Sequence, residues 1–253
     1  MRKAGLRKKR ITLRNVPQRK TQRIEEFEEK TLRLDDFVKQ ILEEKGHLIF
    51  ADECVFKARG FQMSAWSGPN QTVHIEDRTG DQPCQAVCAA VCVCHQLLTF
   101  SIEDDSYNQE KFESFLEQVR DACGDEKIYL FLDNSGVHKA SQAKMKKLGI
   151  VPVWNVPYMP EYNIGIERYW GELKAYFRPL LLSKMLKDPR AKDRPLKDAV
   201  KQSIRDVSTS SIPMYCQRGI EKLSHDAANI RHERKLLGFS DLADNGSPTN
   251  KKV

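Results

Sequence analysis

Strand-like apolar runs come first as a group between residues 46 and 180, and helix-like segments then separate the runs that follow. The first group is rich in apolar, β-branched and aromatic residues, as strands are. Its runs are HLIFADECVF (47–56), FQMSAW (61–66), QAVCAAVCVC (85–94) and LLTFSI (97–102). Because consecutive strands without a helix between them tend to be neighbours in the sheet, this group predicts an antiparallel meander.

Helices separate the strands of the second group. Asn108 is placed to cap a helix that ends at Gly124 and has one apolar side. That side consists of Phe112, Phe115, Leu116, Val119 and Cys123. KIYLFLD (127–133) then predicts a strand, 138–148 a basic helix, and IVPVWNVP (150–157) a further strand. Strands joined through helices add in parallel by right-handed crossovers. The order therefore predicts an α/β fold, with a mixed sheet of the ribonuclease H type and helices on both faces.

Helical patterns flank this region on both sides. Before it, Thr21 can cap a helix whose apolar face recurs every three or four residues. That face consists of Ile24, Phe27, Thr31, Leu34, Val38 and Ile41. After it, one helix has a stripe of Leu196, Val200, Ile204 and Val207, and Pro213 can start another with Cys216, Ile220 and Leu223. We expect a basic arm and linker helix over 1–45, a ribonuclease H-like domain over 46–180, a basic helical extension over 181–238 and a disordered tail over 239–253.

Basic residues are concentrated at the N-terminus. The 253 residues have a net charge of +7 and an isoelectric point near 9.0, and residues 1–23 contain ten basic side chains and no acidic one. The ten are Arg2, Lys3, Arg7, Lys8, Lys9, Arg10, Arg14, Arg19, Lys20 and Arg23. Such a block favours an arm that binds nucleic-acid phosphates, although a solvated tail has the same composition. Without an apolar run of about 20 residues or a secretory signal, the chain is expected to be intracellular, in a eukaryotic nucleus or in bacterial cytoplasm and nucleoid.

Two aspartates interrupt or end apolar strands. Asp52 lies within HLIFADECVF, and Asp133 ends KIYLFLD. A carboxylate in an apolar strand is costly unless it is paired, hydrogen-bonded or bound to a metal. Hard oxygen ligands suit Mg²⁺ or Mn²⁺, and two such ions about 4 Å apart serve phosphodiester chemistry. The two aspartates therefore predict a divalent-metal site at the strand ends.

Glu167 lies on a helix instead of a strand. If Asn163 caps this helix, its buried face consists of Ile166, Trp170, Leu173 and Phe177. The adjacent stripe consists of Glu167, Gly171, Lys174 and Arg178. The Glu167 carboxylate then lies near the positive end of the helix, with two cations further along, where a DNA backbone can run. An ordinary solvated helix face has the same pattern. Glu167 is therefore interpreted as a functional carboxylate only because the two aspartates are present.

Three motifs around these carboxylates occur in a fixed order. They are ADECVF around Asp52, FLDNSGVHKA around Asp133 and VPYMPEYNIGIERYWGELK around Glu167. Together they resemble the DDE transposases of the mariner-like superfamily and related bacterial insertion sequences. The resemblance runs from about Gly46 to Phe177. In NIGIE one residue more than is usual separates Asn from Glu, which predicts a shifted or bulged helix start.

The resemblance implies both an activity and its residues. Asp52, Asp133 and Glu167 would form the catalytic triad and bind two Mg²⁺ or Mn²⁺ ions. The reaction implied is hydrolysis at transposon ends, followed by attack of the freed 3′ hydroxyl on target DNA. The partners would be double-stranded DNA and a second copy of the chain, with no membrane. The residues expected to bind DNA are Arg2, Lys3, Arg7, Lys8, Lys9, Arg10, Lys174 and Arg178.

Two other functions fit the same sequence. One is an inactive or domesticated transposase remnant that binds DNA, because the family places helix-turn-helix modules before the catalytic domain and this chain begins in what resembles the linker after them. The other is a ribonuclease H-like nuclease that acts on structured nucleic acid.

Several further residues are candidates for support of the site. Glu53 points to the face opposite Asp52 if the strand is regular, and together with Asn134 and His138 it is a candidate to hold the metal ligands in place. His138 can orient Asp133, contact DNA or make only local hydrogen bonds.

The cysteines suggest no disulfide framework, since seven is an odd number and three lie in one apolar run. Cys92, Cys94 and His95 suggest zinc, but neighbours on a strand lack the turn that folds a knuckle around a metal. We therefore expect Cys88, Cys92 and Cys94 to share one strand face in the core.

Overall fold

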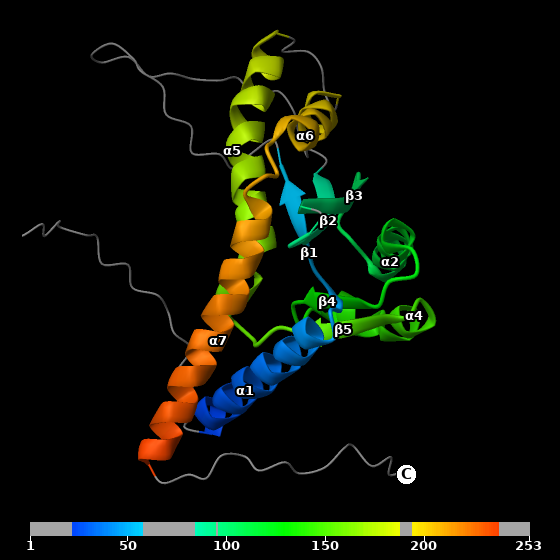
Figure 1. Cartoon of the computed structure of the whole chain (residues 1–253). Helices are drawn as coiled ribbons and strands as arrows, with labels where there is room; N and C mark the ends of the chain where they lie inside the picture. The colour runs from blue at the N-terminus through cyan, green and yellow to red at the C-terminus, as the bar shows by residue number, and fades with distance from the viewer. Residues whose placement is uncertain (1–21, 58–83, 95, 188–193, 238–253) are drawn as a thin grey trace, which may run out of the picture.

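A five-stranded mixed sheet forms the centre of the molecule (Figure 1). The computed structural model describes residues 22–57, 84–94, 96–187 and 194–237. The strand order is β3-β2-β1-β4-β5, in which β1 pairs antiparallel with β2, and β2 with β3, while β1, β4 and β5 run parallel. The strands are β1 His47–Phe56, β2 Gln85–Cys92, β3 Gln96–Glu103, β4 Ile128–Leu132 and β5 Ile150–Trp154. The predicted meander and the parallel additions are thus both present.

Helices cover both faces of the sheet. In Figure 1, α5 and α7 lie on one side of the sheet, and α2 and α4 lie on the other. Helices α1 and α6 pack into the same core as α5 and α7. The helices are α1 Gln22–Glu43, α2 Gln109–Cys123, α3 Gly136–Ala140, α4 Gln142–Lys147, α5 Ile164–Lys187, α6 Arg194–Asp206 and α7 Ile212–Leu236, and a 3₁₀ turn, η2, spans Pro160–Asn163. The described part of the chain is therefore the predicted α/β arrangement.

Strand alternation divides the buried side chains of β1 between two cores. Phe50 and Cys54 belong to the core under α1, α5, α6 and α7, whereas Ile49 and Ala51 belong to the core under α2. A regular strand sends successive side chains to opposite faces, so the acidic neighbours Asp52 and Glu53 must also point to different sides.

The predicted helix faces are mostly confirmed. Phe112, Phe115, Leu116, Val119 and Cys123 of α2 are all buried, and Asn108 Oδ1 accepts a hydrogen bond from the Lys111 backbone N–H at 2.9 Å. Gly124 has φ +59°, the left-handed conformation expected of a helix stop. Ile24 differs from the expectation, because it is 52% exposed at the free end of α1 and contributes nothing to the apolar face there.

Two predicted helices have different ends in the structure. The helix expected over 138–148 is two short helices, α3 and α4, which meet at Ser141. Asn163 does not cap α5: it is the last residue of η2, and its buried side-chain Oδ1 has no hydrogen-bond partner among the described residues. The three residues between Asn163 and Glu167 in NIGIE belong to α5, which begins at Ile164. Thr21, FQMSAW and the tail from 239 lie outside the described residues.

Glycines bring α5 close to α7. A Cβ added at Gly165 would lie 2.3 Å from Cys216 Sγ and 3.2 Å from Cys216 Cα, and one added at Gly219 would lie 2.7 Å from Tyr162 O. Only a residue without a Cβ allows this approach. Helix α7 thereby fixes the start of α5, two residues before Glu167.

No helix in the described ranges is both long enough and apolar enough to cross a membrane.

Candidate active site

Parallel pairing of β1 with β4 brings Asp52 and Asp133 to one edge of the sheet. Phe50 pairs with Phe131, and each aspartate lies two residues further along its chain. Parallel strands end on the same side of a sheet, which is the side where ligands bind in such folds. The structure therefore places the two aspartates together, as the strand order predicted.

Glu167 approaches the same edge from α5, where it lies in the first turn. Three residues later, the indole Nε1 of Trp170 donates a hydrogen bond to Asp52 Oδ2 at 3.2 Å. Trp170 is 4% exposed and belongs to the buried face of α5, as predicted. A side chain on the packed face of α5 thus contacts one of the carboxylates on β1.

The three carboxylates line a cleft of about 440 Å³. Segments after β4 and β5 form the remaining walls. The full lining consists of Asp52, Asp133, Asn134, Ser135, Asn155, Val156, Pro157, Tyr158, Met159, Pro160, Asn163 and Glu167. The oxygens of the three carboxylates do not all lie within 4.8 Å of one another, which is the spacing of a compact single-ion site. A pair of ions about 4 Å apart would need ligands spread more widely.

Burial and neighbouring negative charge act together on Asp52. Burial raises the pKa of its carboxyl to about 7, and the charges of Glu53, Glu167 and Asp133 contribute in the same direction. Such a group is costly to ionise unless a cation is near. The set of oxygen donors therefore fits a hard divalent cation, which would relieve this repulsion.

His138 connects Asp133 to Glu53. The buried imidazole lies on α3, with Nε2 at 2.9 Å from Glu53 Oε1 and Nδ1 at 2.7 Å from Asp133 Oδ1. Burial alone would lower the pKa of His138, but the two carboxylates outweigh it and raise the pKa to about 10. The imidazolium in turn lowers the pKa of Asp133, which stays ionised.

The contacts of Glu53 and His138 bear on the supporting roles predicted for them. Glu53 lies on the opposite face of β1 from Asp52 and pairs with His138, while its charge also raises the pKa of Asp52. The histidine does more than make local hydrogen bonds, because it holds Asp133 in place from β1. Its backbone N–H also bonds Ser135 Oγ at 3.2 Å, so the local interaction is present as well.

Asn134 and Asn155 fix the wall of the cleft. Asn134 Nδ2 donates to the Asn155 carbonyl at 2.6 Å, and the Asn155 backbone N–H donates to Leu132 O at 2.8 Å. Asn155 Nδ2 donates to Met159 O, also at 2.8 Å. The sequence predicts a supporting role for Asn134 but not for Asn155. The polar amide of Asn155 inside the apolar run IVPVWNVP is the feature that could have indicated it.

The basic candidates fall into two groups. Lys174 and Arg178 follow Glu167 along α5, where Lys174 is half-buried and Arg178 exposed. Burial raises the pKa of Glu167, and the charge of Lys174 acts in the opposite direction. Arg2, Lys3, Arg7, Lys8, Lys9 and Arg10 lie outside the described residues.

One cysteine prediction is wrong. Cys88 and Cys92 are buried in β2 as expected, but Cys94 is exposed and lies in a turn after the strand has ended. His95 lies outside the described residues.

Comparison with known proteins supports the fold and the family. A search of curated sequences returns no match. Among solved structures, the Mos1 transposase paired-end complex with left transposon end matches with TM-score 0.57 and 12% identity, over 90% of this chain and 68% of that one. The Mos1 strand transfer complex gives 0.58 and 12% over the same shares. The catalytic domain of Mos1 mariner transposase gives 0.53 and 11%, over 86% and 97%.

At such low identity these likenesses establish the fold, which is that of the Mos1 catalytic domain, and the ribonuclease H-like prediction is confirmed. The assignment of the chain to a family rests on its sequence. A family model described as "DDE superfamily endonuclease" matches residues 47–188, more than half of the chain. The chain therefore belongs to the DDE superfamily endonucleases, as its three acidic motifs predicted.

Proposed function

We propose that this protein cleaves DNA strands and joins them to target DNA with the help of divalent metal ions, as a transposase does. The observation that carries the proposal is the convergence of Asp52, Asp133 and Glu167 on one cleft, from two parallel strands and a helix. The family match supports the endonuclease chemistry, and the raised pKa of Asp52 supports the need for a cation.

Asp52, Asp133 and Glu167 would hold two Mg²⁺ or Mn²⁺ ions. Bound ions of this kind activate the attacking oxygen and stabilise the leaving oxygen of an in-line displacement at phosphorus. The protein's own contribution is to keep the ligands ionised and oriented. His138 keeps Asp133 ionised and oriented, and the Trp170 indole orients Asp52.

DNA would run along α5 past the carboxylates. Lys174 and Arg178 lie seven and eleven residues after Glu167, on the same stripe of the helix. Cations at this spacing can contact successive phosphates and fix the position of the duplex without reading its sequence. Replacing either with Ala should weaken binding to all duplexes alike and lower the salt dependence by about one unit per lost contact.

Transposon ends and a second copy of the chain are the partners we propose. The matched Mos1 structures include a paired-end complex with a transposon end, a strand transfer complex, and forms with Mg or Mn. These names describe Mos1. They make end DNA, target DNA and a dimer the first partners to test for this chain.

The test is a cleavage and joining assay with Mg²⁺ or Mn²⁺. Supercoiled plasmid reports nicking, and a labelled oligonucleotide with a free 3′ hydroxyl reports joining. Asp52→Asn, Asp133→Asn and Glu167→Gln should each reduce both activities about 100-fold or more, since each removes a ligand to ions that contribute several kcal/mol. Asp105→Asn, which neutralises an exposed aspartate away from the cleft, should have no effect.

Two results would contradict the proposed function. One is equal activity in the triad variants and in the unmodified protein. The other is a clear preference for RNA/DNA hybrids over duplex DNA, which would assign the cleft to a ribonuclease H-like nuclease.

A further inference from the structure

A compact group of histidine and cysteine side chains lies at the start of β1, away from the carboxylates. Its ligand atoms belong to His47, Cys92 and Cys94, and all lie within 4.8 Å of one another. Cys94 Sγ is 3.1 Å from His47 Nε2 and 3.4 Å from Cys92 Sγ. Within the described parts of the chain, no other group of three His, Cys, Asp or Glu residues is as compact.

The fold assembles this cluster from residues distant in sequence. His47 begins β1 and Cys92 ends β2, and the antiparallel register places Cys92 opposite Ile49. The chain then turns at Val93 and Cys94 before β3 begins at Gln96, whose φ is +58°. This turn brings Cys94 Sγ back over the end of β2. It supplies the knuckle that a continuous strand would lack.

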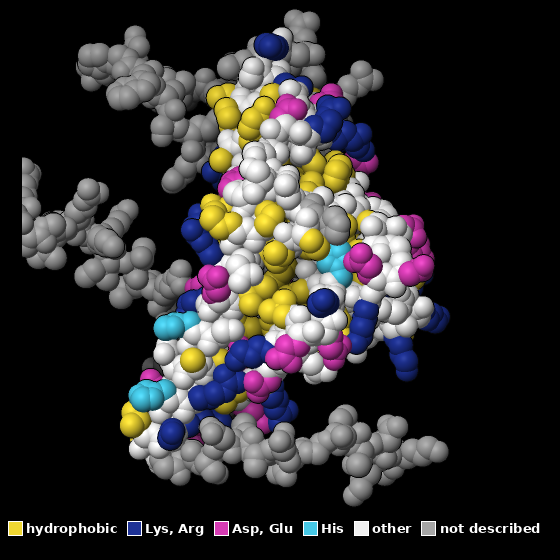
Figure 2. Space-filling view, viewed as in Figure 1, with side chains coloured by type: hydrophobic (Ala, Val, Ile, Leu, Met, Phe, Trp, Pro, Cys, Tyr) yellow, Lys and Arg dark blue, Asp and Glu magenta, His cyan; other side chains and the backbone are white. Residues whose placement is uncertain are grey.

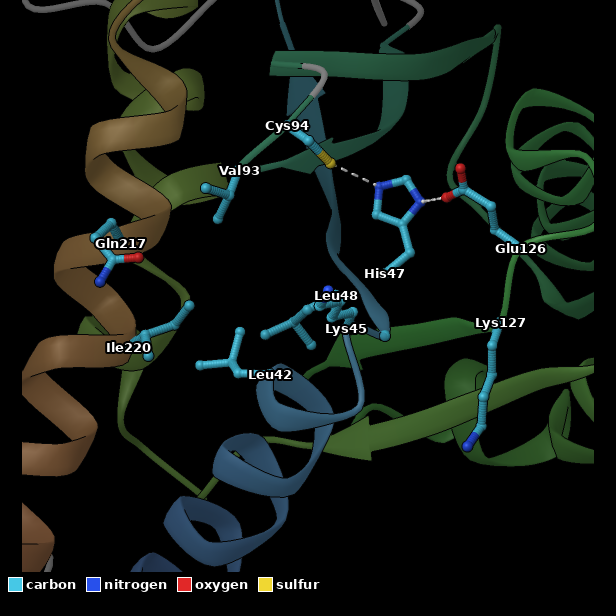
Figure 3. A pocket seen from close by; sticks show the side chains of 11 residues that line it. Leu42, Lys45, His47, Leu48, Val93, Cys94, Glu126, Lys127, Gln217 and Ile220 are labelled. Atoms are coloured by element: carbon cyan, nitrogen blue, oxygen red, sulfur yellow. Dashed lines mark hydrogen bonds and ion pairs between the residues drawn. The ribbon is translucent and has the colours of Figure 1, made fainter.

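Glu126 orients the histidine. Its Oε2 lies 2.7 Å from His47 Nδ1, and Cys94 approaches the ring from the opposite side (Figure 3). In metal sites, a ligating histidine almost always donates its second N–H to a carboxylate, carbonyl or water, which fixes the tautomer. A proton on Nδ1 leaves the lone pair of Nε2 directed at the two sulfurs. The His47 side chain is only 6% exposed, so this orientation is set by the fold.

We propose that His47 Nε2, Cys92 Sγ and Cys94 Sγ bind one Zn²⁺ ion. Two thiolates on a tetrahedral zinc, each about 2.3 Å from it, lie roughly 3.8 Å apart, and a thiolate and an imidazole nitrogen roughly 3.5 Å. The observed separations of 3.4 and 3.1 Å are slightly shorter, so a small outward movement of Cys94 accommodates the ion. Sulfur and imidazole donors select Zn²⁺ over the Mg²⁺ or Mn²⁺ expected at the carboxylates.

Water would complete the coordination. His47 and Cys94 line a pocket of about 530 Å³ together with Leu42, Val93 and Ile220. In the space-filling view, hydrophobic side chains gather between α1 and α7, the helices that contribute Leu42 and Ile220 (Figure 2). Three protein ligands and one solvent-facing position are a known arrangement for zinc.

The zinc would join two parts of the sheet. It ties His47, the first residue of β1, to the turn between β2 and β3. His47 lies five residues before Asp52 on the same strand. At about 3.3 Å per residue, this is roughly 16 Å from the catalytic carboxylate. The site is therefore separate from the proposed catalytic centre, and its test does not depend on DNA cleavage.

Zinc content of the full chain tests the proposal. Protein prepared with a phosphine reductant and passed over a chelating resin should retain or take up one Zn²⁺ per chain, measured by mass spectrometry and by competition with a chromophoric chelator. Co²⁺ in its place should give sulfur-to-metal charge-transfer bands. Because Cys94 is exposed, Cys94→Ser should fold normally by circular dichroism and bind zinc about 100-fold more weakly or worse.

Matched variants separate this site from others. Cys84→Ser changes a cysteine outside the cluster, and Asp133→Asn changes the carboxylate site, so both should bind zinc normally. Glu126→Gln should weaken binding about 10- to 100-fold, as expected for the loss of an orienting carboxylate. Undiminished zinc affinity in Cys94→Ser, loss of zinc in Asp133→Asn, or a Cys92–Cys94 disulfide in place of the metal would overturn the proposal.

Discussion

The indole N–H of Trp170 donates a hydrogen bond to the carboxylate of Asp52, and the two residues are 118 positions apart in the chain. The tryptophan belongs to the packed face of α5, and the aspartate interrupts the apolar strand β1. This single contact couples the burial of the helix to the orientation of a carboxylate at the cleft. It also compensates part of the cost of placing Asp52 in a strand.

Trp170→Phe should keep the fold and weaken the proposed metal site. The variant removes the donor to Asp52 Oδ2 but retains an aromatic ring. Its free energy of unfolding, measured in urea, should therefore be lower by about 1–2 kcal/mol. The Mg²⁺ concentration for half-maximal plasmid nicking should rise about tenfold, because a hydrogen bond to a charged group contributes about 1.5–3 kcal/mol.

Tyr169→Phe is the matched control for that experiment. Tyr169 is buried beside Trp170, with ring centroids 5.1 Å apart, and its hydroxyl has no hydrogen-bond partner in the described structure. Its loss should leave the Mg²⁺ requirement unchanged. An equal shift in both variants would mean that packing matters, and not the hydrogen bond to Asp52.

Replacing His138 should destabilise the protein by separating two carboxylates from their shared cation. In His138→Phe the ring still packs on Phe112, 4.4 Å away, but Glu53 loses its partner while 20% exposed. Breaking such a buried pair costs about 3 kcal/mol, and Asp133, being half exposed, adds little. Urea unfolding at pH 7 measures the loss, and Glu53→Gln combined with His138→Phe should recover part of it.

The pH dependence of this bridge has a definite sign. The pKa of His138 is about 10 in the folded protein and near 6.5 when unfolded, so the folded state holds the proton more tightly. Its stabilising contribution is complete below about pH 6.5 and is lost as pH rises through 10. The difference in unfolding free energy between the unmodified protein and His138→Phe should therefore shrink from pH 7 to pH 10. A constant difference would rule out the ion pair.

Asp52 should reduce stability at high pH when no metal is present. Its pKa of about 7 exceeds the ordinary aspartate value of 3.8, so its stabilising contribution is complete below about pH 3.8 and is lost as pH rises through 7. In EDTA at pH 8, Asp52→Asn should be more stable than the unmodified protein by about 4 kcal/mol, while the two should be similar near pH 4. Mg²⁺ should stabilise only the unmodified protein at pH 8. Asp105→Asn serves as the control, and a destabilised Asp52→Asn would contradict the prediction.

Much of the sheet and part of the site could be predicted because both depend on local patterns. Apolar runs mark β1, β4 and β5, and helices between them require parallel pairing. Once that pairing is known, Asp52 and Asp133 must meet at one edge. The stripe of α5 that contains Glu167 follows from helical periodicity alone.

The remaining features depend on contacts that no local pattern encodes. The hydrogen bond from Trp170 to Asp52 needs the packing angle of α5, and the bridge of His138 to Glu53 needs α3 to lie beside β1. For the cysteines, the apolar pattern predicts a strand that continues to Cys94, and His95 is the next residue in the sequence. The turn at Val93 and Cys94 instead faces His47, which is 47 positions earlier.

Two glycines of α5 should respond in opposite ways to the same substitution. Gly165→Ala places a methyl group against Cys216 of α7, where backbone is 3.2 Å away, so α5 must move and carry Glu167 with it. We expect a loss of about 1–3 kcal/mol in unfolding free energy and reduced nicking. Gly171→Ala meets nothing within 4 Å, and alanine favours helix over glycine, so stability should rise by up to about 1 kcal/mol with nicking unchanged. If Gly165→Ala is as benign as Gly171→Ala, the close contact with α7 does not position Glu167, and the placement of the third carboxylate must depend on the Trp170 side of the helix.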